Sequence, residues 1–477
     1  HPLSATAEAL RREADRLAAL RLDGDAATAV EAALDASYAV LAPDAARLYR
    51  LLGLLPVAEF SSAVAGAAAE LPLPEADRLL DALAAEHLLE ELDGERHRFH
   101  DLIRLHAGEL GRTGESAADG RAAVRRVGEH HLAAATAAEA AIHPGHRTLA
   151  RDYRQPPWHV TEFADSAAAV DWLDRHRAQL TAVLRAAARD QQDGLVWQLT
   201  DAMWPLFNRL RLHRLQVEAH ALGLQAARRA GDREAEKRML TSGGYGLRSA
   251  GRPAEAADWY RQALELALAD GDSRTEAQAR SGIGKAHRLA GELDAARAQF
   301  EQVLGLRAAI GYRRGVGLAH VALGEVAVDA RDLAEAVRQF TDAVTALAQT
   351  PDLHELARAR AMLGRAHTAT GHHRRAEREL TTALAEFSAA GSTHWAARTV
   401  EWLGELALAE VDFDLARERF AESLARYREL GAPDTARLAD RLEHVAAGER
   451  TQARRASDRA TDGRPEGWAD LRPPSTG

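Results

Sequence analysis

The sequence predicts an all-α protein with a small β-wing, whose second half is a right-handed solenoid of helix pairs about 40 residues long. Ala and Leu dominate the composition and aromatic residues make up only 5%, which favours helix throughout. Five glycines recur at a constant spacing of 40: Gly244, Gly284, Gly324, Gly364 and Gly404. Each is followed at a fixed interval by an alanine and, one helical turn further on, by a large apolar side chain. A period of this length is typical of stacked helical repeats.

The repeated glycines predict close packing between helices. A glycine inside a helix costs about 1 kcal/mol relative to alanine, so five in register indicate a neighbouring helix that leaves no room for a side chain. Each unit is expected to hold two helices of about 15–17 residues joined by tight turns. An earlier, degenerate unit carries Trp204, Gln216 and His220 at the signature positions, as expected for a repeat that caps the stack.

The N-terminal third has a different pattern. Helices are expected over residues 3–20 and 26–41, where apolar residues recur at helical spacing. Proline or serine then opens three shorter helices, over 43–55, 61–70 and 74–88. The residues on either side of Asp93-Gly94 predict a two-stranded hairpin. Three helices followed by a β-ribbon make a winged helix.

Composition and charge exclude several classes of protein. A net charge of −10 and a pI near 6.1 argue against a broadly basic surface for nucleic acid. The absence of cysteine excludes disulfides, thiolate metal sites and a cysteine nucleophile. The sequence contains no apolar run of about 18 residues, so no membrane span is predicted. We expect a cytoplasmic protein. The chain starts at His1 without an initiator methionine, which suggests the C-terminal part of something longer.

The sequence predicts neither catalysis nor a metal site. No nucleophile elbow or paired-carboxylate context is present, so we expect no enzyme activity from this chain. His143 and His146 flank a turn without a carboxylate pair to complete a metal site. They are predicted to be solvated, as are His367, His372 and His373 at a turn between helices.

One segment approaches a phosphate-binding loop. Residues 282–286 read Gly-Ile-Gly-Lys-Ala, and they lack both the upstream glycine and the Ser or Thr of the GxxxxGK[ST] pattern. The segment falls inside the first helix of a repeat, where Gly284 has a packing role. We therefore expect no nucleotide-binding loop in this chain.

The repeat signature resembles that of tetratricopeptide repeats, with glycine in the first helix and alanine, an aromatic residue and alanine in the second. The last of these alanines is present at Ala263, Ala343 and Ala383, with Val303 and Ser423 as variants. The longer units and the lack of a closing proline depart from the family pattern. They look like the extended repeats at the C-terminal end of signal-transduction ATPases.

The N-terminal third is similar to the same proteins. Ser37-Tyr38, residues 43–53 and the segment Arg98-Phe99-His100-Asp101-Leu102 resemble the winged helix of NB-ARC regulators. Residues 163–180 resemble the linker between that winged helix and the repeats. Actinobacterial SARP-type antibiotic-regulatory proteins show the closest likeness, which covers about 440 residues.

This resemblance implies a division of the chain into five parts. They are a helical segment that follows a missing nucleotide-binding domain (1–36), a winged helix (37–112), a helical linker (113–195), a tetratricopeptide-like solenoid (196–446) and a disordered tail (447–477). The tail is polar and rich in Arg, Asp, Gly and Pro, so it cannot bury enough apolar surface to become ordered.

The resemblance also implies a role for His100 and Asp101. They correspond to a motif whose histidine approaches the β-phosphate of ADP and holds the inactive state, with Phe99 in place of the usual methionine. This contact needs the missing NB-ARC domain, so ADP and ATP are expected as cofactors of the presumed full-length protein only. In the alternative interpretation, His100 merely caps the helix that starts at Asp101.

The expected partners follow from the same likeness. The winged helix would pack on its own NB-ARC domain, and the repeat groove would bind a protein or peptide effector, with oligomerisation on activation left open. No membrane contact is expected. The groove candidates share a position on the first helix of a repeat: Arg280, His287, His320, Arg360, His367 and Trp402.

Two other functions stay open. The chain could be a free-standing scaffold that binds a partner in its groove. DNA binding by the winged helix is the weaker alternative, because its third helix carries four carboxylates against Arg78 alone and DNA affinity needs positive charge. We expect contact with DNA only indirectly, through another domain.

Overall fold

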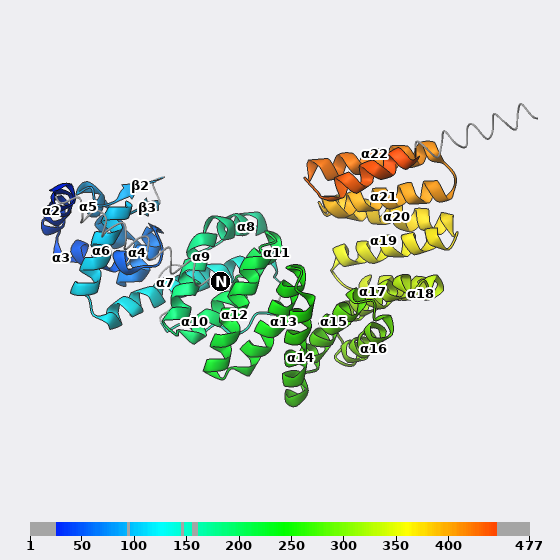
Figure 1. Ribbon diagram of the computed structural model, residues 1–477, viewed down its shortest axis with the longest axis horizontal. Coiled ribbons are helices and arrows are strands. Elements are labelled where there is room, and N and C mark those ends of the chain that lie inside the picture. Colours follow the sequence, from blue (N-terminus) through cyan, green and yellow to red (C-terminus); the bar gives the residue numbers. More distant parts are fainter. Residues whose placement is uncertain (1–24, 93–95, 145–146, 155–160, 446–477) are drawn as a thin grey trace, which may run out of the picture. The chain divides into compact units, whose positions relative to one another are not determined.

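The computed structural model describes residues 25–92, 96–144, 147–154 and 161–445 (Figure 1). The predicted helix over 3–20, the turn at Asp93-Gly94 and the predicted disordered tail over 447–477 lie outside these residues. The chain divides into two compact units, His1–Leu266 and Ala267–Gly477. Helices and one small sheet make up the described part, so the predicted fold class is confirmed.

The first unit starts with short helices around an antiparallel sheet. Its elements are α2 (Asp25–Ala39), α3 (Pro43–Leu54), β1 (Glu59–Ser61), α4 (Ser62–Ala69), α5 (Leu73–Ala85), β2 (Glu90–Glu91), β3 (Arg96–Arg98) and α6 (Asp101–Gly114). The strand order is β1-β3-β2, and β2 pairs with β3 as the predicted hairpin. Strand β1 is not predicted, because so short a strand cannot show an alternating pattern. It is held by the pairing of Phe60 with His97 and by burial of the Phe60 ring.

Helices α3 and α6 cross with their backbones in contact. A Cβ at Gly53 would lie 2.4 Å from the carbonyl carbon of Ala107, and one at Gly111 would lie 2.6 Å from the carbonyl oxygen of Arg50. A side chain at either position would therefore separate the two helices. This crossing fixes the direction of α6, and with it the position of His100 directly before the helix.

The long helix α7 (Ala117–Ile142) packs against α4 on one side and against the following helices on the other. Those helices are α8 (Ser166–Arg175), α9 (Arg177–Arg189), α10 (Asp193–Ala202) and α11 (Trp204–Arg209). They are followed by α12 (His213–Ala230) and α13 (Arg233–Ser249), and α14 (Pro253–Asp270) begins in this unit. One apolar core runs from Ala45 to Ala226. The boundaries placed from sequence at 36, 112 and 195 fall inside α2, α6 and α10, so neighbouring segments share helices.

The second unit is an array of helix pairs. Its helices are α15 (Ser273–Leu289), α16 (Leu293–Ala309), α17 (Arg313–Asp329), α18 (Leu333–Leu347), α19 (Leu353–Ala369), α20 (His373–Ala389), α21 (Thr393–Ala409) and α22 (Phe413–Glu429), and residues 434–445 are also helical. Each of the named helices has 15 or 17 residues, as predicted. Consecutive helices pack on each other along the whole array (Figure 1).

The repeated glycines lie where the two helices of a pair approach most closely. A Cβ at Gly324 would lie 2.5 Å from Cε1 of Phe340, and one at Gly404 would lie 2.8 Å from Cε1 of Phe420. Gly244, Gly284 and Gly364 face the large side chain of their own repeat in the same way. The predicted close approach is confirmed, and its partner is the large apolar residue of the second helix in the same pair.

The turns between helices recur twice in each repeat. A left-handed residue stands at Gly271, Gly291, Gly311, Arg331, Gly371, Gly391, Val411 and Gly431. Both helices of a repeat therefore end in the same backbone turn, except between α18 and α19, where Pro351 takes the place of the left-handed residue. Val411 adopts this conformation, with φ at 63°, against the preference of its β-branched side chain. The two halves of a repeat differ in their side chains, so the sequence repeats every 40 residues although the backbone turn recurs about every 20.

Candidate functional site

His100 lies at the surface of the first unit, directly before α6. Its side chain is 69% exposed, and its Nε2 lies 3.6 Å from Oε2 of Glu90. It occupies the N-cap position, yet its side chain makes no capping hydrogen bond. His100 is thus the N-cap residue, as the capping interpretation expects, but it contributes through its carbonyl oxygen, which accepts from the backbone N–H of Arg104, and not through its imidazole. The ring is directed to solvent, where another protein element can reach it.

A surface hollow of about 640 Å³ adjoins His100. Its lining residues are Val30, Leu34, Arg98, Phe99, His100, Asp101, Leu102 and Ile103. Val30 is 43% exposed and Leu102 39% exposed, although both are large apolar side chains. Exposed apolar groups gathered beside a polar rim are typical of a protein docking surface.

Three of the six predicted groove residues bridge the two helices of their own pair. Arg280, His320 and Arg360 occupy the same position in successive repeats. Each contacts the side chain 19 residues later: Gln299 Oε1 at 3.4 Å, Gln339 Oε1 at 2.7 Å and Glu379 Oε2 at 3.4 Å, respectively. These side chains tie the second helix of the pair to the first, so their hydrogen-bonding capacity is partly used within the repeat.

Two further candidates, His287 and His367, follow a repeated glycine by nearly one helical turn. His287 Nδ1 lies 2.5 Å from Oε2 of Glu292, at the turn that ends the helix. His367 is only 6% exposed and its ring packs edge-on against His372. The prediction that His367 is solvated is wrong, because the ring is enclosed between the helices of its pair. This burial, with the nearby His372 and arginine charges, lowers the pKa of His367.

Trp402, the sixth candidate, lines a hollow of about 360 Å³ in the second unit. The hollow is formed by α15, α17, α18, α19 and α21, through Arg288, Glu325, Val328, Asp329, Leu333, Phe340, Met362, Arg365, Ala366, Ala369, His394, Trp395, Arg398 and Trp402. Its volume is within the range of ligand-binding pockets. It combines an apolar interior with charged groups around it, so it is the candidate effector site of the repeats.

Aromatic rings form one wall of this hollow. Trp395 and Trp402 meet edge to face with their centroids 6.2 Å apart, and Trp395 stacks on Phe387 at 5.7 Å. The guanidinium carbons of Arg365 and Arg398 lie 5.5 and 5.7 Å from the centroid of the Trp402 ring. The sequence indicated Trp402 but not the two arginines, which come from different helices and meet only in the fold.

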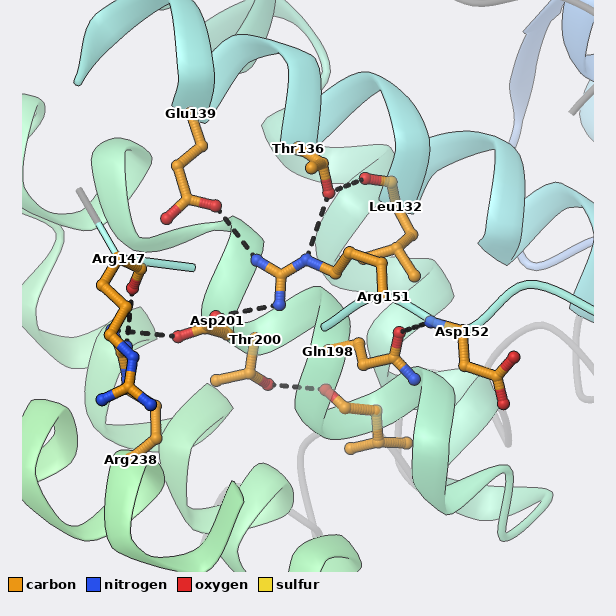
Figure 2. Close-up of polar contacts among 11 residues, drawn as sticks. Leu132, Thr136, Glu139, Arg147, Arg151, Asp152, Gln198, Thr200, Asp201 and Arg238 are labelled. Carbon is orange, nitrogen blue, oxygen red and sulfur yellow. Dashed lines mark hydrogen bonds and ion pairs between the residues drawn. The ribbon is translucent and has the colours of Figure 1, made fainter. Parts of the chain in front are cut away.

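A buried ion cluster in the first unit was not predicted (Figure 2). Arg151 lies outside the helices, in the described segment 147–154, and its guanidinium contacts Oε2 of Glu139 on α7 at 3.0 Å and Oδ2 of Asp201 on α10 at 2.8 Å. These three side chains are 6%, 0% and 2% exposed. A signal was present in the sequence, because Glu139 interrupts an alanine-rich stretch of helix.

Two more contacts hold the same segment in place. Arg238 on α13 donates to the carbonyl oxygen of Arg147 at 2.7 Å, and Gln198 on α10 accepts from the backbone N–H of Asp152 at 2.7 Å (Figure 2). The cluster therefore joins α7, α10 and α13 through an irregular segment, which gives it a structural role.

Buried histidines in the first unit predict a stability that depends on pH. His220 is 1% exposed, and burial lowers its pKa to about 4 despite the hydrogen bond to the carbonyl of Gln216. The unfolded chain binds a proton at this ring below a pH of about 6.5, whereas the folded protein does not. The free energy of unfolding is thus expected to decrease as pH falls from about 6.5 towards about 4.

Thermal unfolding of the full chain at pH 7 and pH 5 tests this expectation. His220→Gln should lower the Tm at pH 7 but reduce the further loss between pH 7 and pH 5. The exposed His444→Gln serves as the control and should leave that loss unchanged. Identical pH dependence in the wild type and His220→Gln would contradict the assignment.

Three other predictions can be compared with the described structure. The loop-like segment 282–286 lies inside α15, and Gly284 packs against Phe300 as expected. Within the described ranges, no group of three or more His, Cys, Asp or Glu residues is placed to hold a metal ion. None of the helices that the structure describes has both the length and the apolar character needed to cross a bilayer.

Comparison with known proteins adds two findings. The family model of the tetratricopeptide repeat matches residues 224–309. The regulatory protein AfsR of Streptomyces coelicolor is 34% identical over 267 residues, and that of Streptomyces griseus is 32% identical over 259 residues. Each match covers 54% of this chain and 26% of the relative, so the chain spans about a quarter of the length of the curated relatives it matches.

Solved structures include similar helical arrays. A signal transduction ATPase with numerous domains and a tetratricopeptide repeat sensor, from Pyrococcus horikoshii, has a TM-score of 0.45 and 13% identity, covering 86% of this chain and 66% of that chain. A Rap protein complexed with competence and sporulation factor has a TM-score of 0.42 and 11% identity, covering 60% and 93%. The chain thus contains tetratricopeptide repeats and is similar, over half its length, to regulatory proteins.

Proposed function

We propose that this chain is the regulatory and sensor portion of a nucleotide-switched transcriptional regulator. Residues 37–112 would form a winged helix that packs on an ADP- or ATP-binding NB-ARC domain, and the repeats would bind a protein or peptide effector. Similarity to regulatory proteins supports the regulatory role. The observation that carries the switching role is the exposed His100 imidazole beside the exposed apolar residues Val30 and Leu102.

The residues around His100 fit a single contact to a phosphate group. The imidazole can donate to a phosphate oxygen, and the N-terminus of a helix favours negative charge. Glu90 and Asp101 stand close by and disfavour an anion, and Arg98 is paired with Glu90 at 2.6 Å. The remaining ligands of a nucleotide would have to come from the NB-ARC domain.

In this proposal, bound ADP supplies the phosphate at the boundary between the two domains. His100 holds that phosphate from the winged-helix side, while Val30 and Leu102 pack on the surface of the nucleotide domain. An effector shifts the equilibrium between closed and open forms only if it binds them with different affinity. The repeat groove is where that difference in affinity would act.

The test is the rate of ADP release from the full-length protein. His100→Ala is expected to speed release by about tenfold or more, because a hydrogen bond to a charged group is lost. A fluorescent ADP analogue chased with excess ADP measures the rate. His372→Ala, at an exposed position of the repeats, is the control and should release ADP like the wild type. An unchanged rate of ADP release in His100→Ala would contradict the proposed contact.

A free-standing tetratricopeptide scaffold is the second candidate function. The Trp402 hollow favours it, because it is complete within the second unit and needs no nucleotide domain. If nucleotide co-purifies with the full-length protein, this result would favour the nucleotide-switched regulator over the free-standing scaffold.

The surface of α5 opposes DNA binding through the winged helix. Asp77 and Asp81 are exposed on this helix, and Arg78 is bonded to Glu75 at 2.5 Å. Phosphate contacts need unpaired positive charge, which this surface does not offer.

A further inference from the structure

Two arginines beside the Trp402 hollow have no close acidic partner. Arg365 Nε lies 3.6 Å from Oε2 of Glu405, and Arg398 Nη1 lies 3.6 Å from Oδ1 of Asp434. Both carboxylates have a nearer arginine, at 2.8 Å for Glu405 and 3.2 Å for Asp434. Among the described residues, neither Arg365 nor Arg398 has a hydrogen-bond acceptor, although a guanidinium carries five N–H donors.

Neighbouring arginines of the same array are bonded much more closely. Arg288, which also lines the hollow, lies 2.6 Å from Oδ2 of Asp329 and pairs with Glu325. Arg358 contacts Glu355 at 2.9 Å and Glu325 at 3.0 Å. Arg365 and Arg398 therefore differ from Arg288, the third arginine that lines the hollow, in keeping their donors open.

The indole of Trp402 helps to hold these two guanidinium groups. Both lie within about 6 Å of its ring centroid, the range in which a cation is attracted to an aromatic face. Trp402 is 4% exposed and packs against Trp395, so it is a fixed support. Arg365 and Arg398 are 51% and 38% exposed. Their donors are thus positioned by the protein and accessible from outside it.

The rest of the hollow fits an apolar group with a single negative charge. Val328, Leu333 and Met362, which are half-buried, supply apolar surface inside it. Arg288 pairs with Glu325 and Asp329, so Arg365 and Arg398 are the positive groups that remain for a ligand. A monoanion suits them, whereas a dianion would be repelled more strongly by the carboxylates nearby, Glu325, Asp329, Glu405 and Asp434.

We propose that this hollow binds a short peptide that carries a carboxylate next to a large apolar side chain. Arg365 and Arg398 hold the carboxylate, and the apolar side chain packs against Val328, Leu333 and Met362. The inference rests on the proposed effector role of the repeats, and it names the chemistry of the effector. It does not depend on the ADP contact of His100.

A scanning library of acetylated and amidated hexapeptides tests the proposal on the full chain. One set has aspartate at a central position and every natural side chain in turn at the flanking positions, and a matched set has asparagine instead. Fluorescence polarisation of labelled peptides measures affinity. The best aspartate peptides are expected to contain a large apolar neighbour and to bind about tenfold or more tightly than their asparagine counterparts.

Variants of the protein connect that preference to the two arginines. Arg365→Gln combined with Arg398→Gln should remove the preference for aspartate while leaving the asparagine peptides unchanged. Arg378→Gln, at an exposed arginine on α20, is the matched control and should bind like the wild type. Both substituted positions are partly exposed, and equal Tm values would verify that the double variant is folded.

Other results would overturn the inference. These are equal binding of the two peptide sets, a preference for aspartate that survives in the double variant, and tighter binding of phosphoserine peptides than of aspartate peptides. A free aromatic acid that binds as tightly as the best peptide would assign the hollow to a small molecule instead. Each of these outcomes leaves the ADP-release experiment on His100 unaffected, so the two proposals fail separately.

Discussion

Replacement of Arg151 by methionine is expected to destabilise the first unit by about 3–5 kcal/mol, the usual cost of removing one partner from a buried ion pair. The arginine is the cation between Glu139 and Asp201, at 3.0 and 2.8 Å, and both carboxylates are almost fully buried (Figure 2). Without it, two negative charges stay inside the protein. Urea unfolding of the full chain, followed by circular dichroism and by hydrogen exchange in α7 and α10, measures the loss.

Two further variants distinguish the effect of burying the arginine from the effect of removing its charge. Arg185→Met removes a bidentate contact to Glu218 at 2.7 and 2.9 Å, but both side chains are at least one-third exposed. It should cost no more than about 1 kcal/mol. Arg151→Met combined with Glu139→Leu and Asp201→Leu should recover most of the stability, because apolar replacement of a buried ion cluster is often neutral. A loss below about 1 kcal/mol in Arg151→Met alone would show that solvent reaches the cluster.

A single added methyl group at Gly324 is expected to destabilise the second unit. The new Cβ would lie 2.5 Å from Cε1 of Phe340, whose ring is 2% exposed. Overpacking of this kind costs about 1–3 kcal/mol, against a gain of about 1 kcal/mol from alanine over glycine in a helix. Gly324→Ala should therefore lose up to about 2 kcal/mol net, read from denaturant unfolding and from hydrogen exchange in α17 and α18.

Gly305 provides the matched control in the neighbouring helix pair. It lies within α16, and a Cβ there would meet nothing within 4 Å. Gly305→Ala should stabilise the unit by about 0.5–1 kcal/mol, because only the helix preference changes. The two identical substitutions are thus expected to differ in sign. Stabilisation by Gly324→Ala would mean that the repeated glycine has no packing role.

The candidate site was only partly predictable. A position on the first helix of a repeat indicated six groove residues, but that position does not decide which side chains are already engaged. Arg280, His320 and Arg360 bond to the second helix of their own pair, and His367 is buried. Trp402 lines the hollow. Arg365 and Arg398 were missed, because an arginine open to a ligand differs from a paired one only in the distance to its carboxylates.

The sequence by itself determined the helix pairs, since the contact between each glycine and the large apolar residue of the second helix is made within one repeat. Spacing along the chain is sufficient for such a local contact. Tertiary structure alone decided the Trp402 hollow and the Arg151 cluster. Arg151 and Asp201 are 50 residues apart, and the lining of the hollow comes from five helices. Which arginine donors stay open depends on how charged residues from distant parts of the chain pair with one another. The 40-residue repeat of the sequence does not indicate that pairing.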